Sequence, residues 1–155
     1  MEEIKIALQL EKDGYAYYKR ASELCKNEYG KKMFKKLAED EVNHLQKFKE
    51  IAEEIFGIKI DDKDEGKHLD IFEKIDFSTK AGEYTAIDHA IKFEEKAYNY
   101  FKEASLKSEN ERIKKLFEEI AKEEEMHKEL LEAERSYIHK SGIWFDYQEF
   151  YMDGL

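Results

Sequence analysis

The sequence contains no proline, one cysteine and seven glycines among 155 residues. Proline interrupts helices and glycine weakens them, so their scarcity favours long helices. A single cysteine, Cys25, excludes an internal disulfide and a Cys-x-x-Cys site, and we expect it to fill space in the core. No apolar run approaches the roughly 20 residues of a membrane span, and the N-terminus is acidic where a secretory signal is basic. We therefore expect a cytoplasmic protein.

Charged residues make up 41% of the chain, and the formal net charge is −10. This acidic excess argues against nucleic acid and anionic membranes as partners, because both require a basic face. Cations suit it better. A chain of this length forms one domain that buries about two thirds of its unfolded surface. The composition predicts an all-α fold over residues 1–155.

Apolar residues recur with helical spacing in four segments, which predicts two helical hairpins. The first hairpin covers residues 2–56 and the second covers residues 85–140. Residues 57–84 have weak periodicity and are expected to form a long crossover between the hairpins. The tail, residues 141–155, is dense in aromatic residues. We expect it to pack across the bundle or against a neighbouring subunit.

Local signals place the helix ends. We expect Asn27 to cap the second helix and Gly57 to end it. Thr85 is expected to cap the third helix, and a capping box starting at Ser108 is expected to begin the fourth. Gly142 follows the expected end of the fourth helix.

The chain contains an internal repeat, because residues 4–44 align without gaps with residues 87–127, 83 positions later. Both copies contain a Glu-x-x-His motif. The identical pairs include Glu11/Glu94, Tyr15/Tyr98, Asn27/Asn110, Glu41/Glu124 and His44/His127. Residues three positions apart share one face of a helix, so the Glu and His of each motif can reach one ion. The chain is two copies of one helical hairpin.

Six metal-ligating side chains lie in the helical stripes that should form the core. They are Glu11, Glu41, His44, Glu94, Glu124 and His127. Burying a carboxylate costs several kcal/mol unless it is paired or binds a cation, and no Lys or Arg lies in these stripes at that level. Two divalent metal ions would neutralise the four carboxylates, and mixed carboxylate and imidazole ligation suits iron, with manganese as the alternative. Di-iron and di-manganese bundles use this ligand set.

Two simpler interpretations stay open. Acidic residues account for 37 of 155 positions, so one Glu-x-x-His motif arises easily by chance. Glu65 and His68 have this spacing too, but they lie in the crossover, off any apolar stripe, and we do not assign them to a metal site. A purely structural bundle with protonated or solvated glutamates is the second alternative to the six-ligand site.

Other residues can hydrogen-bond the ligand side chains and so orient them. Asp40 and Glu123 each lie four positions before the histidine of their own motif, where a carboxylate can accept the ring N–H, or face water instead. Tyr18 lies two turns after the first-helix glutamate and can hydrogen-bond a ligand carboxylate, donate an electron or pack in the core. Tyr15 and Tyr98 are symmetric alternatives for these roles.

With these motifs, the sequence resembles the rubrerythrin branch of the ferritin-like di-iron superfamily over residues 1–140. The resemblance implies a ferritin-like four-helix bundle in which Glu41 and Glu124 bridge two irons. It also implies that Glu11 and Glu94 are terminal ligands and that each histidine binds one iron. The chemistry of that family is oxidation of the diferrous centre by peroxide or dioxygen.

The sequence departs from the family at two points. Ala97 stands where rubrerythrins carry a further ligand glutamate, and there is no rubredoxin-like segment to deliver electrons. We therefore expect a di-iron oxidoreductase of the peroxidase or ferroxidase type that uses an external electron donor and forms a homodimer. The alternative is a metal-binding or iron-handling protein without catalytic turnover.

Overall fold

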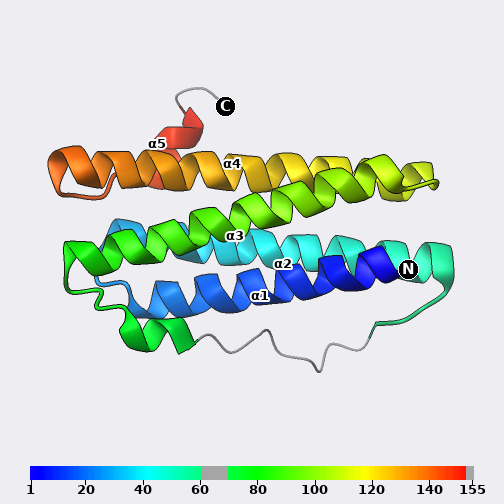
Figure 1. The fold of residues 1–155 in the computed structure, drawn as a ribbon, viewed down its shortest axis with the longest axis horizontal. Coiled ribbons are helices and arrows are strands. Elements are labelled where there is room, and N and C mark those ends of the chain that lie inside the picture. Colours follow the sequence, from blue (N-terminus) through cyan, green and yellow to red (C-terminus); the bar gives the residue numbers. More distant parts are fainter. Residues whose placement is uncertain (61–69, 153–155) are drawn as a thin grey trace.

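The computed structural model describes residues 1–60 and 70–152, and their regular structure is helical. The helices are α1 (Glu2–Leu24), α2 (Glu28–Phe56), the 3-10 helix η1 (Asp70–Lys74), α3 (Lys80–Lys107), α4 (Glu111–Ser141) and α5 (Tyr147–Met152). The four long helices lie alongside one another (Figure 1). The all-α prediction is confirmed. None of the described helices is long and apolar enough to cross a membrane.

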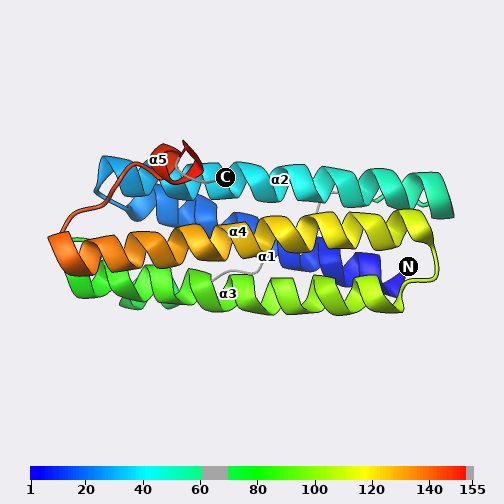
Figure 2. The ribbon, with the colours of Figure 1, turned by 90° about the horizontal axis from the view of Figure 1, so that it is seen from above.

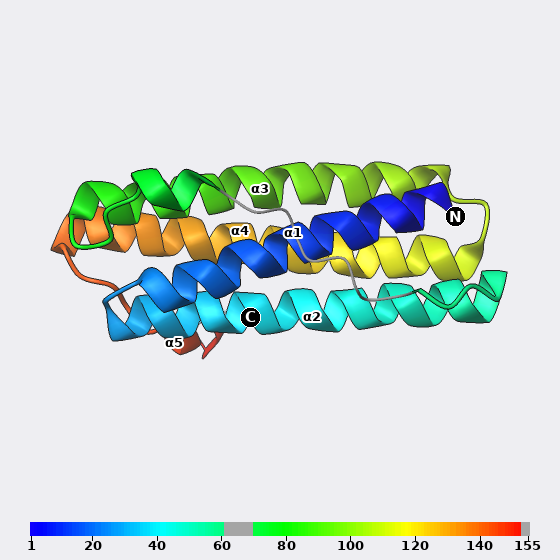
Figure 3. The ribbon, with the colours of Figure 1, turned by 90° about the horizontal axis from the view of Figure 1, so that it is seen from below.

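The four long helices form two antiparallel hairpins, α1 with α2 and α3 with α4, and helix packing is densest within each hairpin. The chain leaves α2 at one end of the bundle and enters α3 at the other, so α3 runs parallel to α2 (Figure 1). Between the hairpins, α1 contacts α3 and α2 contacts α4 (Figures 2 and 3). This is the non-alternating bundle predicted from the long crossover.

The ends of α2 agree with the sequence, whereas the predicted start of α4 was wrong. Asn27 caps α2 by accepting hydrogen bonds from two backbone N–H groups of the first turn, and Gly57 ends it at φ 65°. Asn110, the repeat equivalent of Asn27, caps α4 in the same way. Ser108 instead follows the end of α3, where its backbone is extended and bonds Ala104. The asparagine side chain supplies the cap in both hairpins, so the repeat was a better guide than the capping-box pattern.

Helix α3 begins at Lys80, five residues before the predicted start, because its cap is Thr79. The hydroxyl of Thr79 accepts a hydrogen bond from the N–H of Gly82 at 3.0 Å. The hydroxyl of Thr85 instead donates to a carbonyl one turn earlier within the helix. A Cβ at Gly82 would lie 1.8 Å from the carbonyl oxygen of Asp76, so this first turn requires glycine. The small residue weakens the helical pattern that the sequence shows here.

The apolar core consists of two separate clusters. One includes Cys25 and Phe34 and fills the end of the bundle near the α1–α2 loop, so the cysteine fills core space as predicted. The other includes Phe48, Phe101 and Phe117, whose rings pack together at centroid distances of 5.6–6.2 Å. The layer between the two clusters is occupied by buried acids and histidines.

The aromatic tail packs across its own bundle. Trp144 is 3% exposed, and its ring lies 5.9 Å from that of Phe34. The indole N–H of Trp144 donates to Glu83 on α3, and the backbone N–H of Phe145 donates to Glu134 on α4 at 3.0 Å. Helix α5 then contacts α2 and α4 (Figure 2). The tail therefore ties the two hairpins together at one end.

Candidate metal centre

The six predicted ligands meet in the middle of the bundle, and all six are buried. Each long helix contributes, with one glutamate each from α1 and α3 and a Glu-x-x-His pair each from α2 and α4. Because each pair is three residues apart on a helix, both side chains point inward together. The structure brings together residues 116 positions apart in sequence, from Glu11 to His127.

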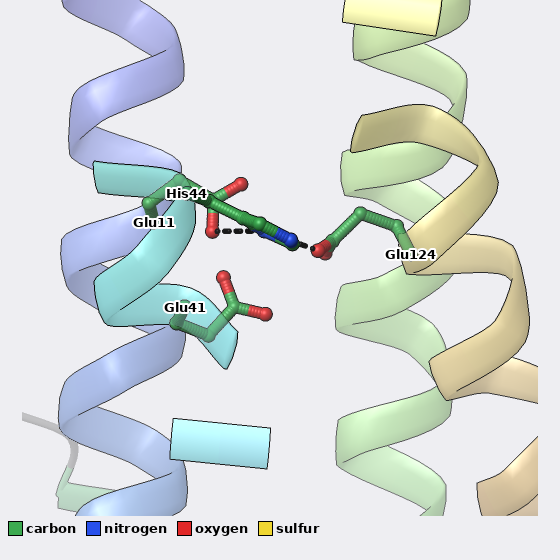
Figure 4. A group of neighbouring side chains, drawn as sticks. All are labelled: Glu11, Glu41, His44 and Glu124. Atoms are coloured by element: carbon green, nitrogen blue, oxygen red, sulfur yellow. Dashed lines mark hydrogen bonds and ion pairs between the residues drawn. The ribbon is translucent and has the colours of Figure 1, made fainter. Parts of the chain in front are cut away.

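The ligand atoms form two groups, and within each group they all lie within 4.8 Å of one another. The group that we name the first position contains Glu11, Glu41, His44 and Glu124 (Figure 4). The group that we name the second position contains Glu41, Glu94, Glu124 and His127. Glu41 and Glu124 belong to both groups. This is the placement that carboxylates bridging two ions require.

Both histidines turn Nδ1 toward the carboxylates. His44 Nδ1 lies 3.2 Å from an oxygen of Glu11 and 3.1 Å from an oxygen of Glu124 (Figure 4). His127 Nδ1 lies 3.4 Å from an oxygen of Glu94. The two rings are stacked at 19° with centroids 6.1 Å apart. Nδ1 is therefore the atom of each ring that can bind an ion.

The outer nitrogen of each ring contacts a carboxylate of the opposite hairpin. His127 Nε2 lies 2.9 Å from Asp40, and His44 Nε2 contacts Glu123. Sequence spacing had paired each carboxylate with the histidine of its own motif. The pairs cross because α2 and α4 are neighbours, so each ring reaches toward the facing helix. An Nε2–H that donates to a carboxylate leaves the Nδ1 lone pair free for a metal ion.

The centre contains many buried polar atoms without a hydrogen-bond partner among the described residues. They are Glu11 Oε1, both carboxylate oxygens of Glu41 and of Glu124, Glu94 Oε2 and His127 Nδ1. A buried oxygen or nitrogen without a partner costs free energy, and a buried charge costs more. Two divalent cations would supply the missing partners. The donor set therefore fits a pair of metal ions.

Tyr18 contacts the ligand layer. It is fully buried, and its hydroxyl donates a hydrogen bond to Glu94 at 2.5 Å. Tyr15 and Tyr98 are only half-buried, and each has a lysine ammonium over its ring at 5.9 Å and 5.7 Å. Of the three tyrosines named from the sequence, Tyr18 is the one placed to hold a ligand carboxylate.

Protonation of the metal-free centre follows from burial and from the neighbouring charges. Burial raises the pKa of Glu11 and of Glu124, and nearby carboxylates raise it further. Burial alone would lower the pKa of His127, but the charge of Glu94 and the contact with Asp40 outweigh it and raise that pKa to about 9. Metal ions bind deprotonated ligands, so metal binding at neutral pH displaces protons from this centre.

A groove of about 580 Å³ between α2 and α4 leads to the histidine side of the centre. It is lined by Lys36, Asp40, Asn43, Gln46, Lys47, Glu50, Glu123, Met126, His127 and Tyr151. On another side, Ala97 is buried in the second apolar cluster, so no side-chain oxygen occupies the position of the further family glutamate. Of the six candidate ligands, His127 lines the groove between α2 and α4.

One buried acid was not identified from the sequence. Glu134 is fully buried on α4, and its second carboxylate oxygen has no partner among the described residues. It lies seven positions, or two helical turns, after His127, and therefore on the same buried face of the helix. This spacing could have identified it as a core position. Its repeat equivalent is the apolar Ile51, so the repeat gave no hint. The additional Glu-x-x-His motif outside the repeat, Glu65 to His68, lies outside the described residues.

Comparison with known families identifies the chain. A family model named Rubrerythrin matches residues 2–135. The chain belongs to the rubrerythrin family. Among solved structures, this rubrerythrin-family chain is similar to "CopM in the Cu(I)-bound form", with 12% identity, a TM-score of 0.69 and coverage of 90% of this chain and 96% of that one. At that identity, the similarity shows only that the two chains share a fold. No curated protein matches it in sequence.

Proposed function

We propose that the protein is a di-iron oxidoreductase that reduces peroxide or dioxygen while Fe(II) is oxidised. The observation that carries the proposal is the pair of four-ligand groups that share Glu41 and Glu124. Two ferrous ions bound there would supply two electrons to a small oxidant. Carboxylate and imidazole ligands favour iron, and manganese is the alternative.

The side chains of the chain have separate tasks in this proposal. Glu41 and Glu124 would contribute to holding both ions, and Glu11 and Glu94 would supply the further negative charge that two divalent cations need. Asp40 and Glu123 orient the two histidines by accepting their Nε2–H groups. Tyr18 restricts Glu94 through its hydroxyl. The apolar clusters on either side exclude water, while the groove between α2 and α4 admits the oxidant.

Copper(I) does not suit this centre, although the structural neighbour is described with it. Copper(I) prefers thiolate and thioether ligands. Neither four-ligand group contains a cysteine, and Cys25 lies in the first apolar cluster.

The second candidate function is binding or handling of iron without turnover. It is favoured by Ala97, which stands where rubrerythrins carry a further ligand glutamate. Sustained consumption of peroxide in the presence of a supplied reductant would rule this candidate out. Oxidation of one iron pair per chain, with no further turnover, would support it.

Anaerobic loading with Fe(II) followed by rapid mixing with peroxide tests the proposed reaction. We expect fast oxidation of two irons per chain and an oxo-bridged di-iron absorption band. The double variant Glu41→Ala, Glu124→Ala should lose both signals. Glu39→Ala with Glu125→Ala is the matched control, because these neighbouring glutamates are exposed. Oxidation in the wild type no faster than in the ligand variant would contradict the proposal.

A further inference from the structure

The carboxylates behind the two ligand histidines are held unequally. Asp40 is 16% exposed, and its two oxygens have separate partners, one in Lys36 Nζ at 2.5 Å and the other in His127 Nε2 at 2.9 Å. Glu123 has one more methylene and is 44% exposed. Among the described residues, its ion pair is with His44. Asp40 is therefore fixed at both ends, whereas Glu123 is fixed at one.

The internal repeat shows that this difference lies in the sequence as well. Lys36 is four positions before Asp40, and the equivalent residue of the second hairpin is Glu119, four positions before Glu123. Glu119 is exposed and carries the same charge as Glu123, so it cannot brace it. Lys47 attracts Glu123 through space from α2. The first copy of the repeat therefore has a lysine that holds its carboxylate, Lys36, and the second copy has Glu119 at the equivalent position.

Lys36 is connected to the second position through Asp40 and His127. A carboxylate that accepts the Nε2–H of a ligand histidine sets the orientation of the ring, and loss of such a partner typically weakens metal binding by about 10–100-fold. A fixed Asp40 holds His127 Nδ1 toward the second position before an ion arrives. His44 depends on an exposed, longer side chain that must lose more rotamer freedom when it holds the ring.

We propose that Lys36 is a positioning residue that makes the second position hold its ion more tightly than the first. This inference rests on the proposed dimetal function. The ion at the first position, among Glu11, Glu41, His44 and Glu124, is then the more readily exchanged of the two. The repeat duplicated the ligands, and the difference at positions 36 and 119 made the two ion positions unequal.

Stepwise addition of Co(II) to the metal-free full-length chain, observed by NMR of its histidine ring protons, tests this proposal. Co(II) is paramagnetic and shifts the Nε2–H signal of the histidine that binds it, so each histidine reports on its own position. His44→Gln and His127→Gln assign the two signals. In the wild type we expect the shifted His127 signal to appear first, with affinities that differ by about tenfold.

Three variants separate positioning from general structure. Lys36→Met should weaken the second position by about tenfold and leave the first unchanged, whereas Lys36→Arg should restore the wild-type order. Glu119→Lys should strengthen the first position, because it supplies the missing brace. Lys35→Met is the matched control, since Lys35 is exposed on the same helix and does not line the groove.

Equal filling of the two positions in the wild type, or the same order in Lys36→Met, would overturn the proposal. A weakening of both positions by Lys36→Met would also overturn it, because that result indicates a general structural effect. If Co(II) shifted neither histidine signal, the dimetal function itself would be wrong. The two failures are therefore distinguishable.

Discussion

Buried carboxylates dominate the chemistry at the scale of single residues. Four of them share one layer with two histidines, and most of their oxygens have no hydrogen-bond partner among the described residues. Such a layer destabilises the metal-free fold, because like charges and unpartnered oxygens are costly away from water. The same layer has the donor atoms to hold cations, which would remove that cost. Ligand substitutions should therefore change the stabilities of the metal-free and metal-bound proteins in opposite directions.

Replacing Glu124 by glutamine is the direct test of this opposition. Glu124→Gln removes one of the crowded carboxylates, so we expect the free energy of unfolding of the metal-free protein to rise by about 1–2 kcal/mol. The variant should lose the stabilisation that Fe(II) or Mn(II) gives the wild type. Urea denaturation with and without metal measures both effects. Equal stabilisation of wild type and variant by metal would contradict the assigned role.

The hydrogen bond from Tyr18 to Glu94 leads to a second prediction. Tyr18→Phe leaves the buried Glu94 without that donor, so we expect metal-free stability to fall by about 1–3 kcal/mol. Tyr98→Phe is the matched control and should stay within about 0.5 kcal/mol, because Tyr98 is half-buried and lies outside the ligand groups. Denaturant unfolding at one pH compares the two. If both variants lost the same stability, the hydrogen bond would have no special role.

At the scale of helices and the tail, local chemistry predicted some boundaries and missed others. Asn27 and Gly57 were predictable because an asparagine cap and a left-handed glycine act within one turn. Thr79 was missed because the turn before α3 depends on Asp76 and Gly82, which the apolar pattern does not register. Glu134 was missed because its role appears only when the tail folds back and offers the N–H of Phe145.

The tail contact at Glu134 makes stability depend on pH. Burial raises the pKa of Glu134 to about 8, above its ordinary value of 4.5. A raised carboxyl pKa favours the folded state at low pH, and that contribution is lost as the pH rises from about 4.5 through about 8. Glu134→Gln keeps the hydrogen-bond acceptor and removes the titration. Between about pH 5 and pH 9 we expect the variant to gain on the order of 4 kcal/mol over the wild type.

Chemical denaturation of both proteins across this pH range measures the difference. Glu132→Gln, on the same helix and partly exposed, is the control and should follow the wild type. A pH-independent difference between wild type and Glu134→Gln would show that the carboxyl group does not titrate as described.

For the molecule as a whole, the metal centre joins two copies of one hairpin. Each candidate ion position combines carboxylates from both hairpins with one histidine. The meeting of these six residues in one buried layer was predictable because stripe position, residue type and repeat register agreed at every one of them. The partners of the two histidines were not predictable from spacing, since they depend on which helices of the two hairpins face each other. The repeat predicts the candidate ligands, whereas the packing of α2 against α4 determines which carboxylate contacts each histidine.

Because each candidate position has carboxylates from both hairpins, bound metal should stabilise the entire bundle cooperatively. Metal at about 100 times its dissociation constant should add about 2.7 kcal/mol for each site, and a chelator should remove this gain. Thermal unfolding followed by helix signal and by tyrosine fluorescence measures it. Two separate transitions in the metal-bound protein, one for each hairpin, would contradict this expectation.

The expected homodimer stays a prediction, which sedimentation equilibrium of the metal-bound protein can test.

The most direct test of the central claim is a crystal structure of the Fe(II)-loaded protein with anomalous data at the iron edge. The six-ligand assignment predicts two iron peaks per chain, both bound by Glu41 and Glu124, with Glu11 and His44 at one peak and Glu94 and His127 at the other. A single peak, no peak in this layer, or iron bound without Glu41 and Glu124 would contradict it.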